Sequence, residues 1–204
     1  MNWKYNHPIR NLFTYATILL LVVGVAALFY WNKEQIFIAL NNQHSNFADL
    51  VLKYFTYVGD GIFMAALAVI MFLVGKRKLG LLLIFSFLLS GLLAQTIKRI
   101  EQRPRPGAYF QQPERIHRVD DKLLKGNNSF PSGHTTTAFA TFSLLAFATR
   151  NRAVQLFFFA VAVVVAYSRI YVGAHFAEDV LAGAALGFIS SYFLCWLLRK
   201  KEWD

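Results

Sequence analysis

The sequence predicts an all-α integral membrane protein, a bundle of six transmembrane helices with an interfacial amphipathic helix in the first outer loop. Two observations lead to this prediction. Of the 204 residues, 56% are hydrophobic and only 16% are charged, a combination that is rare in soluble domains. Apolar runs also recur along the chain, each near the ~20 residues that cross a bilayer. We expect residues 1–204 to form a single domain.

The six predicted spans are the apolar runs at residues 12–30, 61–75, 79–97, 134–149, 153–170 and 177–198. The first run is too long for the core of a signal peptide, and no small-x-small cleavage site follows it, so we expect it to be retained. Helices are favoured because they satisfy their backbone groups internally. Barrel strands would show an alternation that these runs lack.

Residues 31–60, between the first two spans, predict an amphipathic helix in the outer membrane interface. A helix that simply packs on the bundle is an equal alternative. The pattern consists of apolar residues at roughly helical spacing among polar ones: Ile36, Phe37, Leu40, Phe47, Leu50, Val51, Tyr54 and Phe55.

The basic residues predict the orientation of the bundle. They flank the spans on one side, at Lys4 and Arg10, at 76–78, at Arg150 and Arg152, and at 199–201. Short loops rich in Lys and Arg stay in the cytoplasm. We therefore expect both termini to be cytoplasmic in a multi-pass protein of a bacterial cell (inner) membrane. The net charge of +10 belongs to this pattern, and we do not expect nucleic acid as a partner.

Three polar clusters lie at predicted span ends on the opposite, outer side: Lys98 to Arg105, Ser132 to His134, and Arg169 to Asp179. Ionisable groups at membrane depth are costly and usually mark a site. Clusters placed at random would fall on both faces of the membrane. Because all three fall on one face, we predict a single site that faces the periplasm or the exterior.

His175 and Asp179 are four residues apart and would share one face of a helix. Asp179 would then fix the tautomer of His175 and stabilise its charged form, leaving the other ring nitrogen as a nucleophile. The alternative is a pair at the start of a helix that stabilises a loop. Glu178 would point elsewhere and favour the helix dipole.

The sequence Pro131-Ser132-Gly133-His134 opens the fourth span. Free N–H groups at a helix start suit an anion, Gly133 permits close approach, and Ser132 adds a hydroxyl. His134 is a candidate proton donor to a leaving alkoxide. An ordinary cap with Ser132 as N-cap is the alternative, and it gives no reason for the histidine.

Three cations, Lys98, Arg105 and Arg169, are candidate ligands of phosphate oxygens. Taken singly, each could instead be an anchor at the membrane interface. We expect no metal site and no cofactor, because no known metal-binding spacing is present and the surrounding cations would repel a metal. We read the single cysteine, Cys195, as a small apolar filler.

These clusters resemble the three-part signature of the type-2 phosphatidic acid phosphatase superfamily. The parts are K-x6-R-P at Lys98 to Pro106, P-S-G-H at 131–134, and S-R-x5-H-x3-D at Ser168 to Asp179. All three are complete and in order. The match covers about 80 residues directly, and the six-span layout extends it along the chain and favours the membrane lipid-phosphatase branch.

The resemblance implies a metal-independent phosphatase that works through a phosphohistidine. By that likeness His175 attacks phosphorus, Asp179 supports it, and His134 protonates the leaving group and then activates water. The phosphoryl oxygens would be held by five residues, as phosphoryl transfer requires: Lys98, Arg105, Ser132, Gly133 and Arg169.

The expected substrate is a lipid phosphate in the bilayer: undecaprenyl pyrophosphate, phosphatidylglycerophosphate, phosphatidic acid or lipid A. A lipid phosphotransferase using the same phosphohistidine is the alternative enzyme. A transporter would need stronger polar residues inside the spans than serine and threonine. The sequence leaves open the substrate, the oligomeric state and whether the loop 107–128 contacts a head group.

Overall fold

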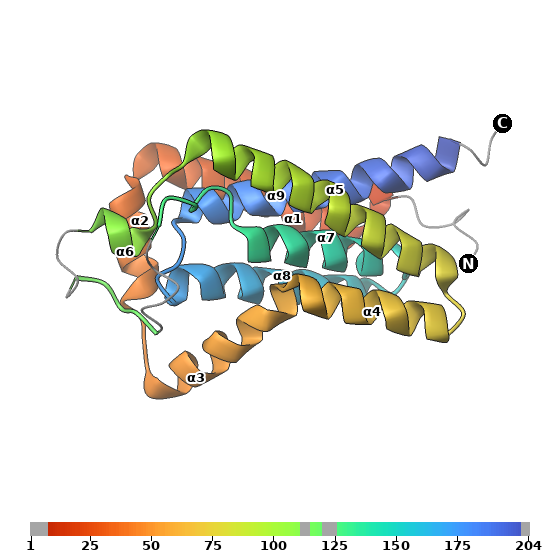
Figure 1. The fold of residues 1–204 in the computed structure, drawn as a ribbon, viewed down its shortest axis with the longest axis horizontal. Coiled ribbons are helices and arrows are strands. Elements are labelled where there is room, and N and C mark those ends of the chain that lie inside the picture. Colours follow the sequence, from red (N-terminus) through yellow and green to blue (C-terminus); the bar gives the residue numbers. More distant parts are fainter. Residues whose placement is uncertain (1–7, 111–114, 120–125, 201–204) are drawn as a thin grey trace.

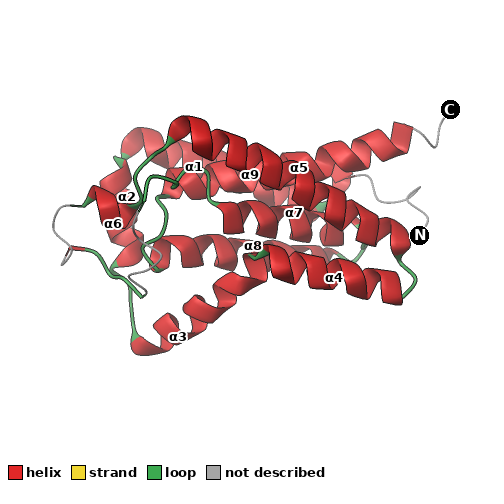
Figure 2. Cartoon of the chain, viewed as in Figure 1, coloured by secondary structure: helices red, strands yellow, loops and turns green. Residues whose placement is uncertain are grey.

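The protein folds into a bundle of helices, seen in a computed structural model that describes residues 8–110, 115–119 and 126–200 (Figure 1). Within these residues the secondary structure is helical and no strand occurs (Figure 2). The principal helices are α1 (Leu12–Tyr30), α4 (Gly61–Leu73), α5 (Arg77–Glu101), α7 (Gly133–Phe147), α8 (Arg152–Tyr171) and α9 (Ala177–Lys200). Each coincides with one predicted span, and the largest difference is at the end of α5, predicted at 97 and observed at Glu101.

Side-chain caps set the start of several helices. Asn11, Asp60 and Asn151 precede α1, α4 and α8, and each accepts hydrogen bonds from backbone N–H groups of the first turn. Such caps satisfy donors that have no partner within the helix. Gly75, with a φ of 76°, makes the turn between α4 and α5 in a backbone conformation that other residues rarely adopt.

The protein is a multi-pass membrane protein, but only part of the six-span count is supported. Within the described chain, four helical segments are long and apolar enough to cross a membrane, and they contain α1, α5, α8 and α9. A fifth candidate joins residues 46–59 to α4 across a bend of 56°. Helix α7 has 15 residues, or about 22 Å, which falls short of the ~30 Å of hydrocarbon.

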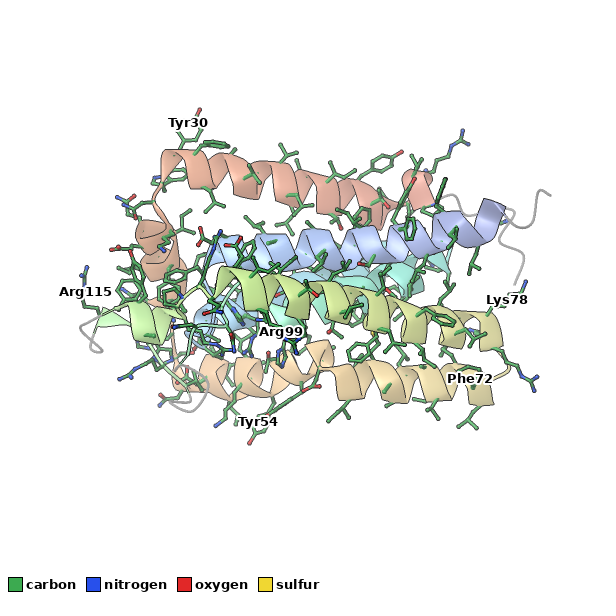
Figure 3. The ribbon with its side chains drawn as sticks, turned by 45° about the horizontal axis from the view of Figure 1, so that its top comes forward. Tyr30, Tyr54, Phe72, Lys78, Arg99 and Arg115 are labelled. Carbon is green, nitrogen blue, oxygen red and sulfur yellow. The ribbon has the colours of Figure 1, made fainter. Side chains whose placement is uncertain are left out.

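Residues 31–60 form two helices and a turn where the sequence predicted one amphipathic helix. These are α2 (Lys33–Asn41), α3 (Asn46–Phe55) and the 3-10 turn η3 (Thr56–Gly59). Helix α3 exposes apolar side chains such as Phe47 and Leu50, and Tyr54 points away from the bundle (Figure 3). The break falls at residues 42–45, where Ser45 caps α3. Placement of α3 in the membrane interface stays a prediction.

Helix α7 lies at the centre of the bundle and packs against α5, α8 and α9 (Figure 1). All its residues from Thr135 to Leu144 are buried. Two glycines of α9 allow close contact: a Cβ on Gly183 would lie 2.6 Å from the backbone oxygen of Ser132, and one on Gly187 would overlap that of Thr136. Small residues of this kind let membrane helices approach closely.

Hydrogen bonds between serines also join the central helices. The hydroxyls of Ser86 on α5 and Ser191 on α9 lie 2.8 Å apart, and Ser191 donates to the backbone oxygen of Ala140 on α7. Three helices thus meet through one polar contact in an apolar interior. These three polar groups are thereby paired with each other or with backbone.

The bundle has two distinct ends. The described termini and the α4–α5 turn lie together at one end, where Lys78 projects, and Arg115 projects at the other (Figures 1 and 3). Helices α2, α3 and α6 (Pro106–Tyr109) lie toward the end of Arg115. The basic loops and the predicted site clusters therefore lie toward opposite ends, as the predicted orientation requires.

We expect Gly187→Ala to destabilise the protein by about 1–3 kcal/mol, because the added methyl overlaps backbone of α7 and the packed helices must move apart. Thermal unfolding in detergent measures this. Gly91→Ala on α5 is the matched control, because nothing lies within 4 Å of its added methyl. Equal melting temperatures for the two variants would contradict the close-packing account.

Candidate active site

His175 and Asp179 meet in a fully buried polar contact. His175 lies in the turn between α8 and α9, ahead of the helix and not on its face as the spacing suggested, because α9 begins at Ala177. Its Nδ1 is 3.5 Å from Oδ2 of Asp179. Both side chains are almost completely buried, at 2% and 1% exposed. The turn is held by the backbone N–H of His175, which donates to the backbone oxygen of Arg169.

Ser129 completes this contact, and no motif or spacing in the sequence predicted its role. The Ser129 hydroxyl donates to Oδ2 of Asp179 at 2.6 Å and lies 3.4 Å from Nδ1 of His175. The backbone N–H of Phe176 donates to the same carboxylate oxygen at 2.8 Å. Ser129 stands in a loop without periodicity, three residues before Ser132, so only the fold brings it to the pair.

Burial controls the charge of the pair. Burial lowers the pKa of His175, although the hydrogen bond to Asp179 opposes this effect. His175 is therefore a neutral imidazole at neutral pH, which is the form that can act as a nucleophile. Asp179 accepts two hydrogen bonds at one oxygen, and its other oxygen, Oδ1, is buried without a partner among the described atoms.

The Pro131-Ser132-Gly133-His134 segment opens α7 directly beside the pair. The backbone N–H of Ser132 donates to the backbone oxygen of Asp179, which links the start of α7 to the start of α9. Ser132 occupies the N-cap position but makes no side-chain cap hydrogen bond; its hydroxyl instead accepts one from Thr135. Open space surrounds the position of a Cβ on Gly133. The alternative in which Ser132 is an ordinary N-cap therefore does not account for this serine.

Three cations converge on the same region, as the sequence predicted. Lys98, in the last turn of α5, donates to the backbone oxygen of Asn128 at 2.7 Å. Arg169, near the end of α8 and 2% exposed, donates from Nη1 to the hydroxyl of Thr56, and its Nε has no described partner. Arg105 is half-buried at the start of α6.

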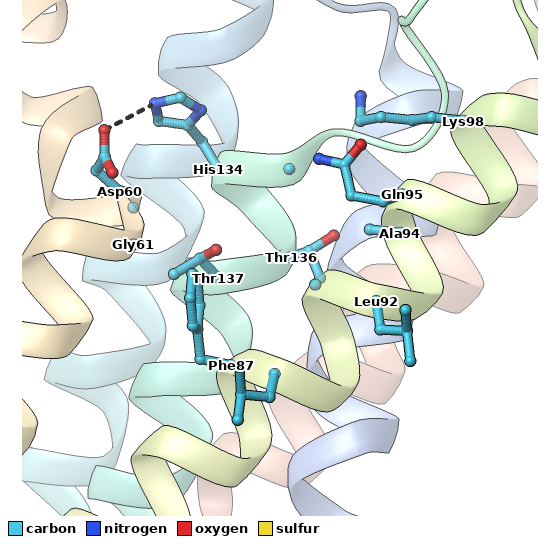
Figure 4. Close-up of a pocket in the computed structure, with 14 residues that line it drawn as sticks. Asp60, Gly61, Phe87, Leu92, Ala94, Gln95, Lys98, His134, Thr136 and Thr137 are labelled. Atoms are coloured by element: carbon cyan, nitrogen blue, oxygen red, sulfur yellow. Dashed lines mark ion pairs between the residues drawn. The ribbon is translucent and has the colours of Figure 1, made fainter.

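His134 faces a cavity of about 460 Å³ between α4, α5 and α7 (Figure 4). Polar groups of Asp60, Gln95, Lys98 and His134 line one part of it, and apolar side chains such as Phe87 and Leu92 line the remainder. Nε2 of His134 is 4.0 Å from Oδ2 of Asp60, a contact that the sequence did not predict. The cavity therefore joins a charged region to an apolar one.

Arg103, between Lys98 and Arg105, serves the structure around the site. Its guanidinium contacts Glu101 at 2.9 Å and Glu178 at 3.6 Å and stacks 4.3 Å above the ring of Phe130. Glu178, predicted to favour the helix dipole, thus also pairs with a cation. These contacts hold the segment before α7 against the start of α9.

A second polar cluster holds the outer segments to the end of α8. Asn41, buried on α2, donates to backbone oxygens of His117, Ile170 and Tyr171, and accepts from the N–H of His117. Asp49 accepts from Tyr171 at 2.6 Å and lies 2.7 Å from Nε2 of His117. The sequence identified no partner for His117. Its ring also stacks on His44, at 4.0 Å between centroids.

No group of three or more His, Cys, Asp or Glu side chains suited to a metal occurs in the described parts of the chain. Cys195 is buried in α9, as expected of an apolar filler. Of the loop 107–128, residues 111–114 and 120–125 lie outside the described residues. Head-group contacts from that loop stay a prediction.

A helical membrane bundle that gathers two histidines, a carboxylate and three cations at one site defines a membrane hydrolase of phosphate esters. The model of the PAP2 superfamily matches residues 79–203, which include all three clusters. The chain belongs to the PAP2 superfamily.

Curated relatives carry the names of lipid phosphatases. A lipid A 1-phosphatase of Rhizobium johnstonii is 38% identical over 53% of this chain and 43% of its own length, so the chain matches less than half of that relative. A lipid A 1-phosphatase of Rhizobium etli is 31% identical over 73% of each chain. Phosphatidylglycerophosphatase B of Bacillus subtilis is 30% identical over 68% of this chain and 70% of its own.

Two crystal structures share the fold. LpxE of Aquifex aeolicus superposes with a TM-score of 0.72 at 26% identity, covering 80% of this chain and 93% of the other. The PAP2-type phosphatidylglycerolphosphate phosphatase of Bacillus subtilis superposes with a TM-score of 0.68 at 26% identity, covering 96% of both.

We expect Asn41→Ala to lower the stability by about 1–3 kcal/mol, because it leaves buried carbonyl groups at the end of α8 without donors. Thermal unfolding in detergent measures the loss. Asn42→Ala, at the adjacent exposed position, is the control and should unfold near the unaltered protein. A stable Asn41→Ala variant would show that the second polar cluster does not hold α2 to α8.

Proposed function

We propose that this protein is a metal-independent lipid phosphatase that acts at the outer face of the membrane through a phosphohistidine. One observation carries the proposal: the buried contact of His175, Asp179 and Ser129 lies at the end of a bundle where three cations and a second histidine converge. The cations supply the positive charge that phosphoryl transfer needs.

In the first proposed step, Nε2 of His175 attacks phosphorus, since Nδ1 faces Asp179 and Ser129. A P–N bond forms as the P–O bond to the lipid breaks. The proton on His134 passes to the leaving lipid oxygen, and the carboxylate of Asp179 stabilises the positive charge that develops on His175.

In the second step water hydrolyses the intermediate. Neutral His134 removes a proton from water, the water oxygen bonds to phosphorus, and the P–N bond breaks. His175 returns to its neutral form and inorganic phosphate leaves. The two histidines thus end the cycle in the protonation states in which they began.

The remaining site residues would bind the phosphoryl oxygens. Arg169 offers Nε, which has no described partner, and Lys98 and Arg105 add charge nearby. The first N–H groups of α7 around Gly133 add donors and the positive end of the helix dipole. The open space around Gly133 leaves room for an oxygen. Ser129 would orient the pair of His175 and Asp179 and not touch the phosphate.

The substrate class follows from the setting of the cavity and from the relatives. A charged region that joins an apolar one suits a phosphate attached to a lipid. Lipid A, phosphatidylglycerophosphate and undecaprenyl pyrophosphate come first, because similar proteins are named for them. Phosphatidic acid shares the chemistry. The names favour hydrolysis over transfer to a second lipid.

We expect the purified protein to release phosphate from one or more of these four lipids in detergent containing EDTA. His175→Ala should lower the rate at least about a thousandfold, because the nucleophile is removed. The control is His44→Ala, an exposed histidine outside the site, which should remain close to the unaltered protein. Near-normal turnover by His175→Ala would contradict the assignment of His175 as the nucleophile. Loss of activity in EDTA would support a metal-dependent mechanism instead.

We expect a radiolabelled lipid phosphate to label the protein during turnover, with the label lost in acid as phosphohistidine requires. His134→Ala should retain more label, because hydrolysis of the intermediate needs its base. Rapid quenching in alkaline detergent, followed by electrophoresis at alkaline pH, measures the label, and acid treatment of a parallel sample tests its loss. Adding a second lipid distinguishes the alternative enzyme: label appearing on that lipid in place of inorganic phosphate would identify a phosphotransferase.

A further inference from the structure

Asp60 is a carboxylate placed opposite His134, and it lies outside all three sequence clusters. It stands at the junction of η3 and α4, on the far side of the cavity from Lys98 (Figure 4). Its Oδ2 points at Nε2 of His134 over 4.0 Å. The side chains are partly exposed, at 35% and 31%, so both border the cavity.

The position of Asp60 is fixed by the fold on two sides. Its other oxygen, Oδ1, accepts the N–H of Ile62 at 3.1 Å as the N-cap of α4. Its neighbour Gly59 contacts α7 so closely that a Cβ would lie 2.7 Å from the backbone oxygen of His134. The carboxylate is thus held by a cap and by a helix contact, and its free oxygen faces the imidazole.

The charges around His134 give this carboxylate a role. Positive charge acts on the ring from α8, from the segment before α6 and from α5, while Asp60 supplies the negative charge among the described groups. A smaller pocket that His134 also lines contains a lysine and a tyrosine. The groups concerned are Arg169, Arg105, Lys98, Lys53 and Tyr57. An imidazolium in this setting would be disfavoured without a nearby carboxylate.

We propose that Asp60 is the positioning residue of His134, a second acid–histidine pair that faces the pair of His175 and Asp179. This inference rests on the proposed function. Asp60 accepts a hydrogen bond from Nε2–H of His134, which leaves Nδ1–H for the leaving lipid oxygen. Catalytic hydrogen bonds are often long before substrate binds and shorten in the complex.

The proton movements follow from this pairing. In the first step the Nδ1 proton of His134 passes to the lipid oxygen as the P–O bond breaks. The imidazole becomes neutral and keeps its Nε2 proton, which still donates a hydrogen bond to Asp60. In the second step Nδ1 takes a proton from water. Asp60 keeps one orientation of the ring through both steps and stabilises its charged form.

Asp60→Asn is the sharpest test, because asparagine is also a good N-cap and removes the charge without removing the cap of α4. We expect kcat/KM for a short-chain phosphatidic acid in detergent, which reports the first step alone, to fall at least about tenfold, a part of the general-acid contribution. With p-nitrophenyl phosphate, whose leaving group needs little protonation, the fall should be less than about threefold. Asp60→Glu, which keeps the charge, should recover part of the loss.

The pH profile separates positioning from a merely structural effect. Asp60 favours the protonated form of His134, so without its charge that form is lost at lower pH. The basic limb of the profile for phosphatidic acid should therefore shift to lower pH in Asp60→Asn. In a His134→Ala background, Asp60→Asn should cause no further loss, because the two residues act as a unit.

The outcomes distinguish this inference from the proposed function. If Asp60→Asn matches the unaltered protein in rate, pH profile and leaving-group dependence, Asp60 has no role and the phosphatase proposal stands. Equal losses with both substrates and an unchanged pH profile also overturn the pairing and indicate a structural effect. If the unaltered protein hydrolyses neither phosphatidic acid nor p-nitrophenyl phosphate, the general-acid role falls and the inference falls with it.

Discussion

The buried carboxylate of Asp179 is the constraint on which the rest of the site depends. Its Oδ2 accepts from Ser129 and from the backbone of Phe176, and its own backbone oxygen accepts from Ser132. One residue therefore joins the turn after α8, the segment before α7 and the start of α9. A charge enclosed in an apolar bundle needs such partners, because an unpaired one is very costly to bury.

The packing of α7 transmits this constraint to the whole bundle. Small residues on α9 bring the two helices into backbone contact, and Ser191 joins both to α5. Lys98 and Arg169 project from α5 and α8, so the neighbours that enclose α7 also deliver its cations. Close packing sets the positions of the charges, and the burial it creates keeps His175 neutral.

The sequence was sufficient where the signal is local. Apolar runs located the principal helices, and spacing located the three clusters, because membrane length and motif spacing are both read along the chain. The sequence was insufficient for contacts between residues that are distant along the chain. Ser129 and Asp60 reach the histidines only through the fold, and His175 precedes α9 because the carboxylate of Asp179 caps the N–H of Phe176. The break between α2 and α3 falls in the polar residues 42–45, and the apolar spacing on either side did not predict it.

The shortness of α7 has a consequence for how the protein meets the bilayer. Helices α5, α8 and α9 extend past the start of α7 (Figure 1), and Gly133 at that start borders the cavity of about 460 Å³. Under the proposed function, a phosphate would enter this cavity while its hydrocarbon chains stay in the lipid, and the freed phosphate would return to water. Bilayer thickness would then become a variable of turnover, since a thicker or thinner membrane changes how far a head group must be displaced from its resting plane.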